Sequence, residues 1–81
     1  MARIIVYVTH RKLPVGDQWN VMRDGNTVAH FLTQQDAIRS AVDHAHLKGK
    51  AGHDAQVIVQ GNDGHIHTEW TYGHDPYPPR G

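Results

Sequence analysis

The sequence predicts an α+β fold of two layers, in the element order β-β-β-α-β-β, with one helix on a five-stranded sheet. Only residues 33–49 place apolar side chains at helical spacing, and their narrow stripe of small residues cannot form a core unless it packs on a sheet. The other apolar segments are short, rich in β-branched residues and bounded by turn residues, which is typical of strands. We therefore expect one domain over residues 1–70 and a proline-rich tail over residues 71–81.

Capping residues mark both ends of the predicted helix. Thr33 precedes the first turn and is a suitable N-cap, with Asp36 at the position of a capping-box acid. Gly49 follows the last turn, and we expect it to adopt the left-handed conformation that commonly ends a helix.

Five strands are expected around this helix. Residues 3–9 are apolar on both faces and should form the central strand, whereas a proline and a glycine make residues 10–17 a loop. Glycine beside Asp or Asn predicts tight turns at residues 24–26 and 61–64. The remaining strands are then residues 18–23, 27–32, 55–60 and 65–70. A right-handed crossover through the helix favours a mostly antiparallel sheet in the order 3-2-1-4-5.

Strand alternation assigns the side chains to two faces of the sheet. The residues expected to face the helix are Ile4, Val6, Val8, Trp19, Val21, Phe31, Val57, Val59 and Ile66. Those expected on the open face are Ile5, Tyr7, Met22, Val28, His30, Ile58, His65, His67 and Glu69. Ile5, Tyr7, Met22 and Ile58 would form an apolar centre on that open face. Because so large an apolar patch is unusual on a small monomer, we expect a homo-oligomer with this interface, most simply a two-fold dimer.

The amino-acid composition argues against several classes of function. The 81 residues include no cysteine, which excludes thiol chemistry, and the basic and acidic residues are equal in number. No broad positive field is therefore present to attract nucleic acid or an anionic membrane surface. The apolar run near the start is too short for a signal sequence or a membrane span, so we expect a cytoplasmic protein without a membrane partner.

Four groups of motif residues resemble those of a known family. They are Trp19 to Arg23 with Gly25-Asn26, Thr33 to Ile38 with Ala41, Val57 to Gly61 with Asp63-Gly64 and Ile66, and Tyr72 to Pro79. This pattern is similar to that of the Domain of Unknown Function 2188 family of small bacterial and phage proteins. The resemblance implies a compact domain with no known catalysis. Asp36 departs from the family's usual Glu, and His65 and His67 stand where the family is rich in Lys and Arg.

Neither a catalytic set nor a metal centre is predicted. Ser40 lies on the exposed side of the helix without a recognisable Ser-His-Asp arrangement, so no catalytic residue and no cofactor are expected. His65 and His67 alternate along a strand and Glu69 continues their row, which makes the two histidines weak metal candidates. Zinc needs three or four converging ligands, so a metal-dependent hydrolase is the least supported hypothesis.

The favoured function is a non-catalytic binding protein that self-associates and holds a small polar or phosphorylated ligand or a protein partner. Its expected ligand-binding residues are Tyr7, His30, His65, His67 and Trp70. By analogy, such a protein could serve a phage as an anti-defence factor that sequesters its target. The alternative is a nucleic-acid-binding module that uses basic residues near Tyr7. These residues are Arg3, Arg11, Lys12 and Arg23.

The sequence also predicts where the two tryptophans and the tail pack. Trp19 alternates with Val21 toward the helix and is predicted to be core, whereas Trp70 either packs under the tail or contacts a ligand. The prolines of the tail favour an extended, polyproline-like arm that docks beside Trp70 on the same subunit or its neighbour. A disordered terminus is the alternative.

Overall fold

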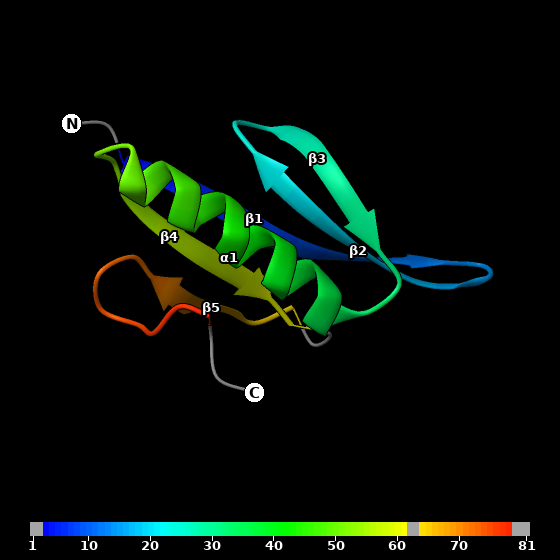
Figure 1. The fold of residues 1–81 in the computed structure, drawn as a ribbon. Coiled ribbons are helices and arrows are strands. Elements are labelled where there is room, and N and C mark those ends of the chain that lie inside the picture. Colours follow the sequence, from blue (N-terminus) through cyan, green and yellow to red (C-terminus); the bar gives the residue numbers. More distant parts are fainter. Residues whose placement is uncertain (1–2, 62–63, 79–81) are drawn as a thin grey trace.

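The computed structural model describes residues 3–61 and 64–78, and it shows one helix lying across one face of a five-stranded sheet (Figure 1). The elements are β1 (Arg3–Leu13), β2 (Gly16–Arg23), β3 (Asn26–Phe31), α1 (Gln34–Lys50), β4 (Asp54–Gln60) and β5 (Ile66–Thr71). The sheet order is β3-β2-β1-β4-β5, with β1 and β4 parallel and the other pairs antiparallel. The predicted fold class, element order and sheet order are confirmed.

β1 is central because it is apolar on both sides. Val6 and Val8 are fully buried beneath α1, whereas Tyr7 points to the opposite face. The hydrophobic core consists of Ile4, Val6, Val8, Trp19, Val21, Ala37, Ala41, Val42, Ala45, Ala55, Val57, Val59 and Trp70, and Phe31 packs against it. The prediction that Trp19 is a core residue is confirmed, since its side chain is 5% exposed.

The start of α1 agrees with the prediction, but its end does not. The Asp36 backbone N–H donates to Thr33 Oγ1 at 3.2 Å, which confirms Thr33 as the N-cap. The helix then continues past Gly49 to Lys50, and Gly52 takes the positive φ of 102° in the turn that follows. Gly49 is buried inside the last turn, where the ring of Tyr72 occupies the space that a Cβ would need. Its missing side chain therefore serves packing instead of helix termination.

The loop predicted for residues 10–17 is wrong, because β1 and β2 continue as a two-stranded ribbon. Their pairing extends to Leu13 opposite Gly16, and the chain reverses at residues 14–15. His10 supports the ribbon from one side: its ring lies 4.6 Å from that of Trp19, and its Nε2 is 2.8 Å from Asp17 Oδ1. We call residues 10–19 the ribbon; it projects from the body of the domain (Figure 1).

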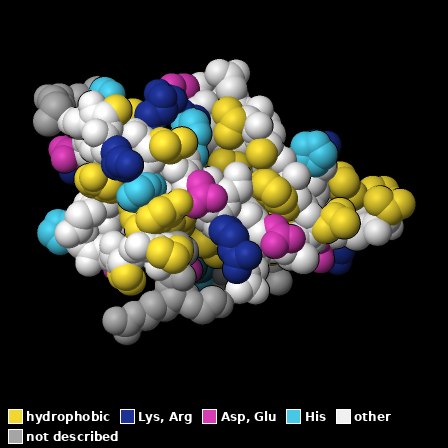
Figure 2. All heavy atoms as spheres, viewed as in Figure 1, with side chains coloured by type: hydrophobic (Ala, Val, Ile, Leu, Met, Phe, Trp, Pro, Cys, Tyr) yellow, Lys and Arg dark blue, Asp and Glu magenta, His cyan; other side chains and the backbone are white. Residues whose placement is uncertain are grey.

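The end of the ribbon is apolar. Val15 is 94% exposed at this tip, and Figure 2 shows hydrophobic side chains at the projecting end of the molecule. On the rest of the face in that view, which carries α1, basic, acidic and histidine side chains are interspersed. No helix among residues 3–61 and 64–78 has the length and apolar character needed to cross a membrane.

A bulge in β5 changes which side chains face the helix. Val57 pairs with Trp70 but Ile58 pairs with Thr68, so Glu69 is an extra residue in the ladder. Ile66 consequently lies opposite Gln60, where it is 68% exposed. The prediction that Ile66 faces the helix is wrong, and Trp70, only 2% exposed, belongs to that layer instead.

The same bulge moves His67 away from the open face. His67 pairs with Val59, and opposite residues of an antiparallel pair share a face, so His67 lies on the side that bears α1. Its expected place on the open face is therefore wrong. A comparable irregularity in β3 leaves Val28 as an extra residue, because Val21 pairs with Ala29 and Met22 with Thr27.

The described part of the tail packs on its own chain beside Trp70. The Trp70 indole N–H donates to the Pro76 carbonyl at 2.9 Å, and the ring of Tyr77 stacks on that of His46 at 3.6 Å. The Tyr77 hydroxyl donates to Asp43 Oδ1 at 2.8 Å, and this bond raises the pKa of Tyr77. Docking beside Trp70 is confirmed, although residues 72–78 form turns and bends instead of an extended arm. The end of the proposed arm, residues 79–81, lies outside the described residues.

Candidate functional site

The apolar centre forms as predicted on the open face. Tyr7 of β1 pairs with Met22 of β2 and with Ile58 of β4, so these three side chains lie side by side. Ile5 precedes Tyr7 by two residues on the same face. Tyr7 is 42% exposed, and the other three members of the centre are half-buried. α1 packs on the opposite face of the sheet, so among residues 3–61 and 64–78 no helix covers the apolar centre.

Neutral polar residues surround the apolar centre. They are Thr9, Asn20, Gln56 and Thr68, which the strand register places on the same face. The Thr9 hydroxyl donates to Met22 Sδ at 3.5 Å, which joins this rim to the centre. A second surface with the same composition could approach the face without meeting a like charge at its middle.

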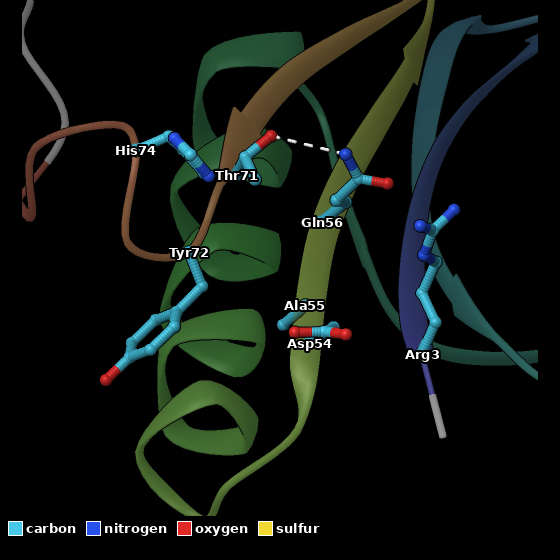
Figure 3. Close-up of a pocket in the computed structure, with 7 residues that line it drawn as sticks. All are labelled: Arg3, Asp54, Ala55, Gln56, Thr71, Tyr72 and His74. Atoms are coloured by element: carbon cyan, nitrogen blue, oxygen red, sulfur yellow. Dashed lines mark hydrogen bonds between the residues drawn. The ribbon is translucent and has the colours of Figure 1, made fainter. Parts of the chain in front are cut away.

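A polar pocket lies at one end of this face, where β1 and β4 begin and β5 ends (Figure 3). It has a volume of about 290 Å³ and is lined by Arg3, Asp54, Ala55, Gln56, Thr71, Tyr72 and His74. Gln56 Nε2 donates to Thr71 Oγ1 at 3.3 Å. Figure 3 shows Gln56, Thr71 and His74 gathered on one side of the sheet, with Arg3 on the neighbouring strand and Tyr72 pointing away.

The tail holds His74 at this pocket. The Thr71 backbone N–H donates to Asp75 Oδ2 at 2.8 Å, and the His74 N–H donates to the Thr71 carbonyl at 3.1 Å. These two bonds close a tight turn immediately after β5. The position of His74 therefore depends on contacts between the strand and the turn that follows it.

The chemistry of the pocket suits a small anion that also carries hydroxyl groups. The Arg3 guanidinium provides several donors in a planar fork, which matches carboxylate or phosphate oxygens. Gln56 and Thr71 add neutral hydrogen-bonding groups, and His74 adds a ring that can donate. Asp54, the register partner of Arg3, brings a formal negative charge to the same pocket, so the pocket does not suit a polyanion.

The residues predicted to bind a ligand do not converge. Tyr7 and His30 share the open face but lie on β1 and β3, with β2 between them. Trp70 is buried with its indole N–H bonded to the tail, so its ring is not available to a ligand in this arrangement. His65 is exposed just before β5, and His67 lies on the helix side.

The histidines of the last hairpin form no metal centre in the structure as described. His67 Nε2 lies 3.2 Å from Glu69 Oε2, on a bulged part of β5. Within residues 3–61 and 64–78, no three His, Cys, Asp or Glu side chains converge in a way that could hold a metal ion.

Sequence reasoning missed Gln56, Thr71 and His74 as site residues. They come from β4, the last residue of β5 and the tail, and of the three only His74 falls within a group of motif residues. One signal was present: strand alternation places Gln56 on the same face as Ile58. The proximity of Thr71 and His74 to Gln56 depends on how β5 pairs with β4, which the bulge determines.

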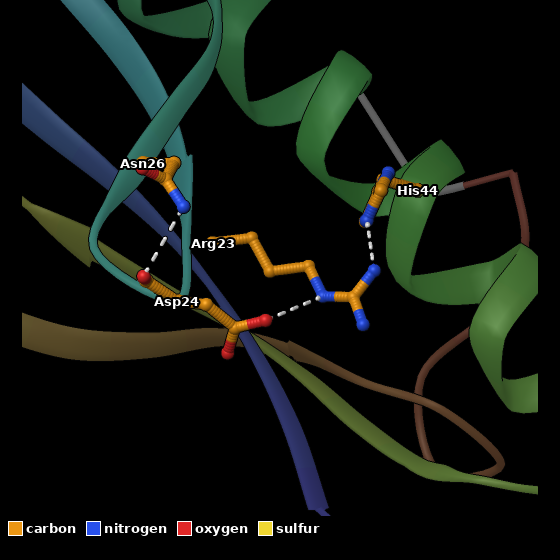
Figure 4. A network of polar contacts seen from close by, with 4 residues as sticks. All are labelled: Arg23, Asp24, Asn26 and His44. Atoms are coloured by element: carbon orange, nitrogen blue, oxygen red, sulfur yellow. Dashed lines mark hydrogen bonds and ion pairs between the residues drawn. The ribbon is translucent and has the colours of Figure 1, made fainter.

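The four basic residues of the nucleic-acid hypothesis do not form one cluster. Arg3 lines the pocket, and Arg11 and Lys12 lie in the ribbon. Arg23 extends from β2 toward α1, with Nη1 3.5 Å from His44 Nε2 and Nε 3.5 Å from Asp24 Oδ2 (Figure 4). Arg23 does not share a face with Tyr7, because Met22 rather than Arg23 is the partner of Tyr7.

The surroundings of His44 disfavour the charged form of its imidazole. Its partial burial lowers its pKa, and the charges of Arg23 and Lys48 lower the pKa further. As the pH falls through about 6.5, the unfolded chain gains this proton before the folded chain does, so His44 makes the folded state less stable at acidic pH. We predict that NMR titration of the imidazole gives Arg23→Gln a higher His44 pKa than the unmutated protein.

Arg39→Gln, on the exposed side of α1, is the matched control for that titration and should leave the His44 pKa unchanged. Equal His44 pKa values in the unmutated protein and Arg23→Gln would show that the guanidinium does not act on this imidazole.

Comparison with known proteins agrees with the motifs of the sequence. Residues 7–72 match a family model described as "Uncharacterized protein conserved in bacteria (DUF2188)". No curated protein and no solved structure matches the chain. The matched segment begins in β1 and ends just after β5, so it includes α1 and most of the sheet. The protein therefore belongs to the DUF2188 family.

Proposed function

We propose that this protein is a non-catalytic binding protein, which forms a two-fold dimer through its open sheet face and holds a small anionic ligand in the polar pocket. The observation that carries this proposal is the continuity of the two surfaces. Ile5 of the apolar centre pairs with Gln56 of the pocket across β1 and β4. A contact that covers the centre would therefore also border the pocket.

A second copy of the chain is the partner that best fits the apolar centre. In a two-fold dimer the same patch is used on both subunits, so a single contact buries the apolar centre of each subunit. The neutral rim places no like charges opposite one another at the middle of the contact. A domain of 81 residues also gains stability from association, because so small a chain buries only a modest core of its own.

The pocket defines the ligand class. One guanidinium, one neighbouring carboxylate and several neutral donors suit a molecule with a single phosphate or carboxylate and some hydroxyl groups. Such a protein would act by sequestering its ligand in the bacterial cytoplasm, and anti-defence in a phage-infected cell is one use of that action. A protein partner on the same face is the competing occupant. Nucleic-acid binding draws its main support from Arg11 and Lys12 on the ribbon.

The dimer is tested by placing a charge in the apolar centre. We expect Ile58→Asp to convert a dimer into a monomer at tens of micromolar, because the carboxylate would be buried without a partner in the interface. Light scattering measures the mass directly. Leu47→Asp places a carboxylate at an exposed apolar residue of α1, on the opposite side of the sheet, and should leave the dimer intact. A monomeric unmutated protein would contradict the proposed interface.

The pocket is tested with inorganic phosphate as the probe. Arg3→Gln should weaken phosphate binding about tenfold or more, because a hydrogen bond to a charged group contributes roughly 1.5–3 kcal/mol. Titration followed by ³¹P NMR gives the affinity. Arg39→Gln removes a guanidinium from the exposed side of α1 and should not change it. Equal losses in the two variants would mean that phosphate responds only to net charge.

A further inference from the structure

The pocket and the ribbon lie at opposite ends of β1, at equal distances from the apolar centre. Arg3 lines the pocket, Arg11 lies in the ribbon, and each is four residues from Tyr7. At about 3.3 Å per residue, each arginine is roughly 13 Å from Tyr7 along the strand. Because alternate residues share a face, both arginines belong to the side of the sheet that carries the apolar centre.

This spacing has a consequence for a two-fold dimer centred on Tyr7. If the β1 strands of the two subunits run in opposite directions across the interface, Arg11 of each subunit lies over the start of β1 and β4 in the other. That region contains Arg3 and Asp54, which are direct partners in the register. If the strands run in the same direction, Arg11 instead faces Arg11 of the partner subunit.

Charge favours the first arrangement. Asp54 is the register partner of Arg3, so the region that an incoming guanidinium meets has no formal net charge. In the second arrangement two guanidinium groups face one another directly, which is unfavourable. The β1–β2 pairing continues for two residues beyond Arg11, so Arg11 is held in the paired part of the ribbon.

We infer that the ribbon of each subunit borders the pocket of the other, and that Arg11 of the partner subunit completes the binding site for a small phosphate or carboxylate anion. This inference rests on the proposed dimer. Within one chain Arg3 and Asp54 bring formal charges of opposite sign to the pocket, so Arg11 of the partner subunit adds one positive charge for the ligand. Ligand binding and dimerisation then strengthen one another, because the complete site exists only in the dimer.

The arrangement can be tested without a ligand, because the chain has no cysteine. Arg11→Cys and Gln56→Cys proteins are mixed, allowed to exchange subunits and treated with a short bismaleimide. The inference predicts a covalent dimer that contains one chain of each variant, and little crosslinking of Arg11→Cys alone. Efficient crosslinking of Arg11→Cys with itself would establish the other strand direction and overturn the inference.

Subunit complementation tests the shared site itself, with inorganic phosphate as the probe. Arg3→Gln and Arg11→Gln should each weaken phosphate binding at least tenfold while remaining dimers by light scattering. After the two variants exchange subunits, each mixed dimer contains one site with both arginines and one site with neither. We expect about one quarter of all sites to recover the affinity of the unmutated protein, since half of the dimers are mixed.

The outcomes separate this inference from the proposed function. The double variant Arg3→Gln with Arg11→Gln, treated in the same way, should recover no site and serves as the control. A mixture that binds no better than its two components, or an Arg11→Gln protein with unchanged affinity, would overturn the shared site but leave the dimer standing. An unmutated protein that is monomeric would overturn the dimer, and one that binds no phosphate would overturn the anion site in either form.

Discussion

Replacing Trp19 with alanine should lower the free energy of unfolding by about 3 to 5 kcal/mol, which is the usual cost of removing a large aromatic side chain from a core. Trp19 is 5% exposed and pairs with Phe31 across β2 and β3. Its ring also lies 4.6 Å from that of His10 at the base of the ribbon. Because a small domain has only a few kcal/mol of net stability, much of the Trp19→Ala protein should be unfolded at room temperature.

Urea denaturation followed by circular dichroism measures this loss. Trp19→Phe is the matched control, since it keeps an aromatic ring in the same layer and should retain most of the stability. An unchanged urea midpoint for Trp19→Ala would mean that the side chain is not part of the core. Trp70 lies on β5, which β1 and β4 separate from β2, and it remains as a buried fluorescence probe in both variants.

Replacing Gly49 with alanine should destabilise the protein by about 1 to 3 kcal/mol, the usual cost of overpacking a core. In an unobstructed helix interior the same change is stabilising by about 0.5–1 kcal/mol, because glycine loses more conformational freedom on folding. Here the new methyl group would overlap the ring of Tyr72, which lies against the last turn of α1. We expect the steric effect to exceed the gain in helix propensity.

Whether Gly49→Ala stabilises or destabilises a Tyr72→Ala protein separates the steric effect from the gain in helix propensity. In a Tyr72→Ala protein the obstructing ring is gone, so Gly49→Ala should become stabilising there. The four proteins form a double-mutant cycle that thermal or urea unfolding can measure. If Gly49→Ala stabilises the protein even when Tyr72 is present, the packing of the segment after β5 on α1 is not as described.

The fold class and the sheet order were predictable from local patterns of residues. The stripe of small residues in residues 33–49 has helical spacing and therefore predicts a helix. β1 is apolar on both faces, so it belongs at the middle of the sheet. The apolar centre was also predictable, because strand alternation is local and Tyr7 and Ile58 lie in regular stretches of β1 and β4.

The residues that line the pocket and the ends of the helix and strands depend on tertiary contacts. The extra Glu69 reverses the faces of Ile66 and His67, and a bulge depends on the partner strand instead of on local propensity. Gly49 resembled a helix terminator, but its role follows from Tyr72, a residue 23 positions later in the chain. Gln56, Thr71 and His74 meet only because β5 and its turn fold back on β4. These features arise from contacts between distant segments, which no local pattern of residues encodes.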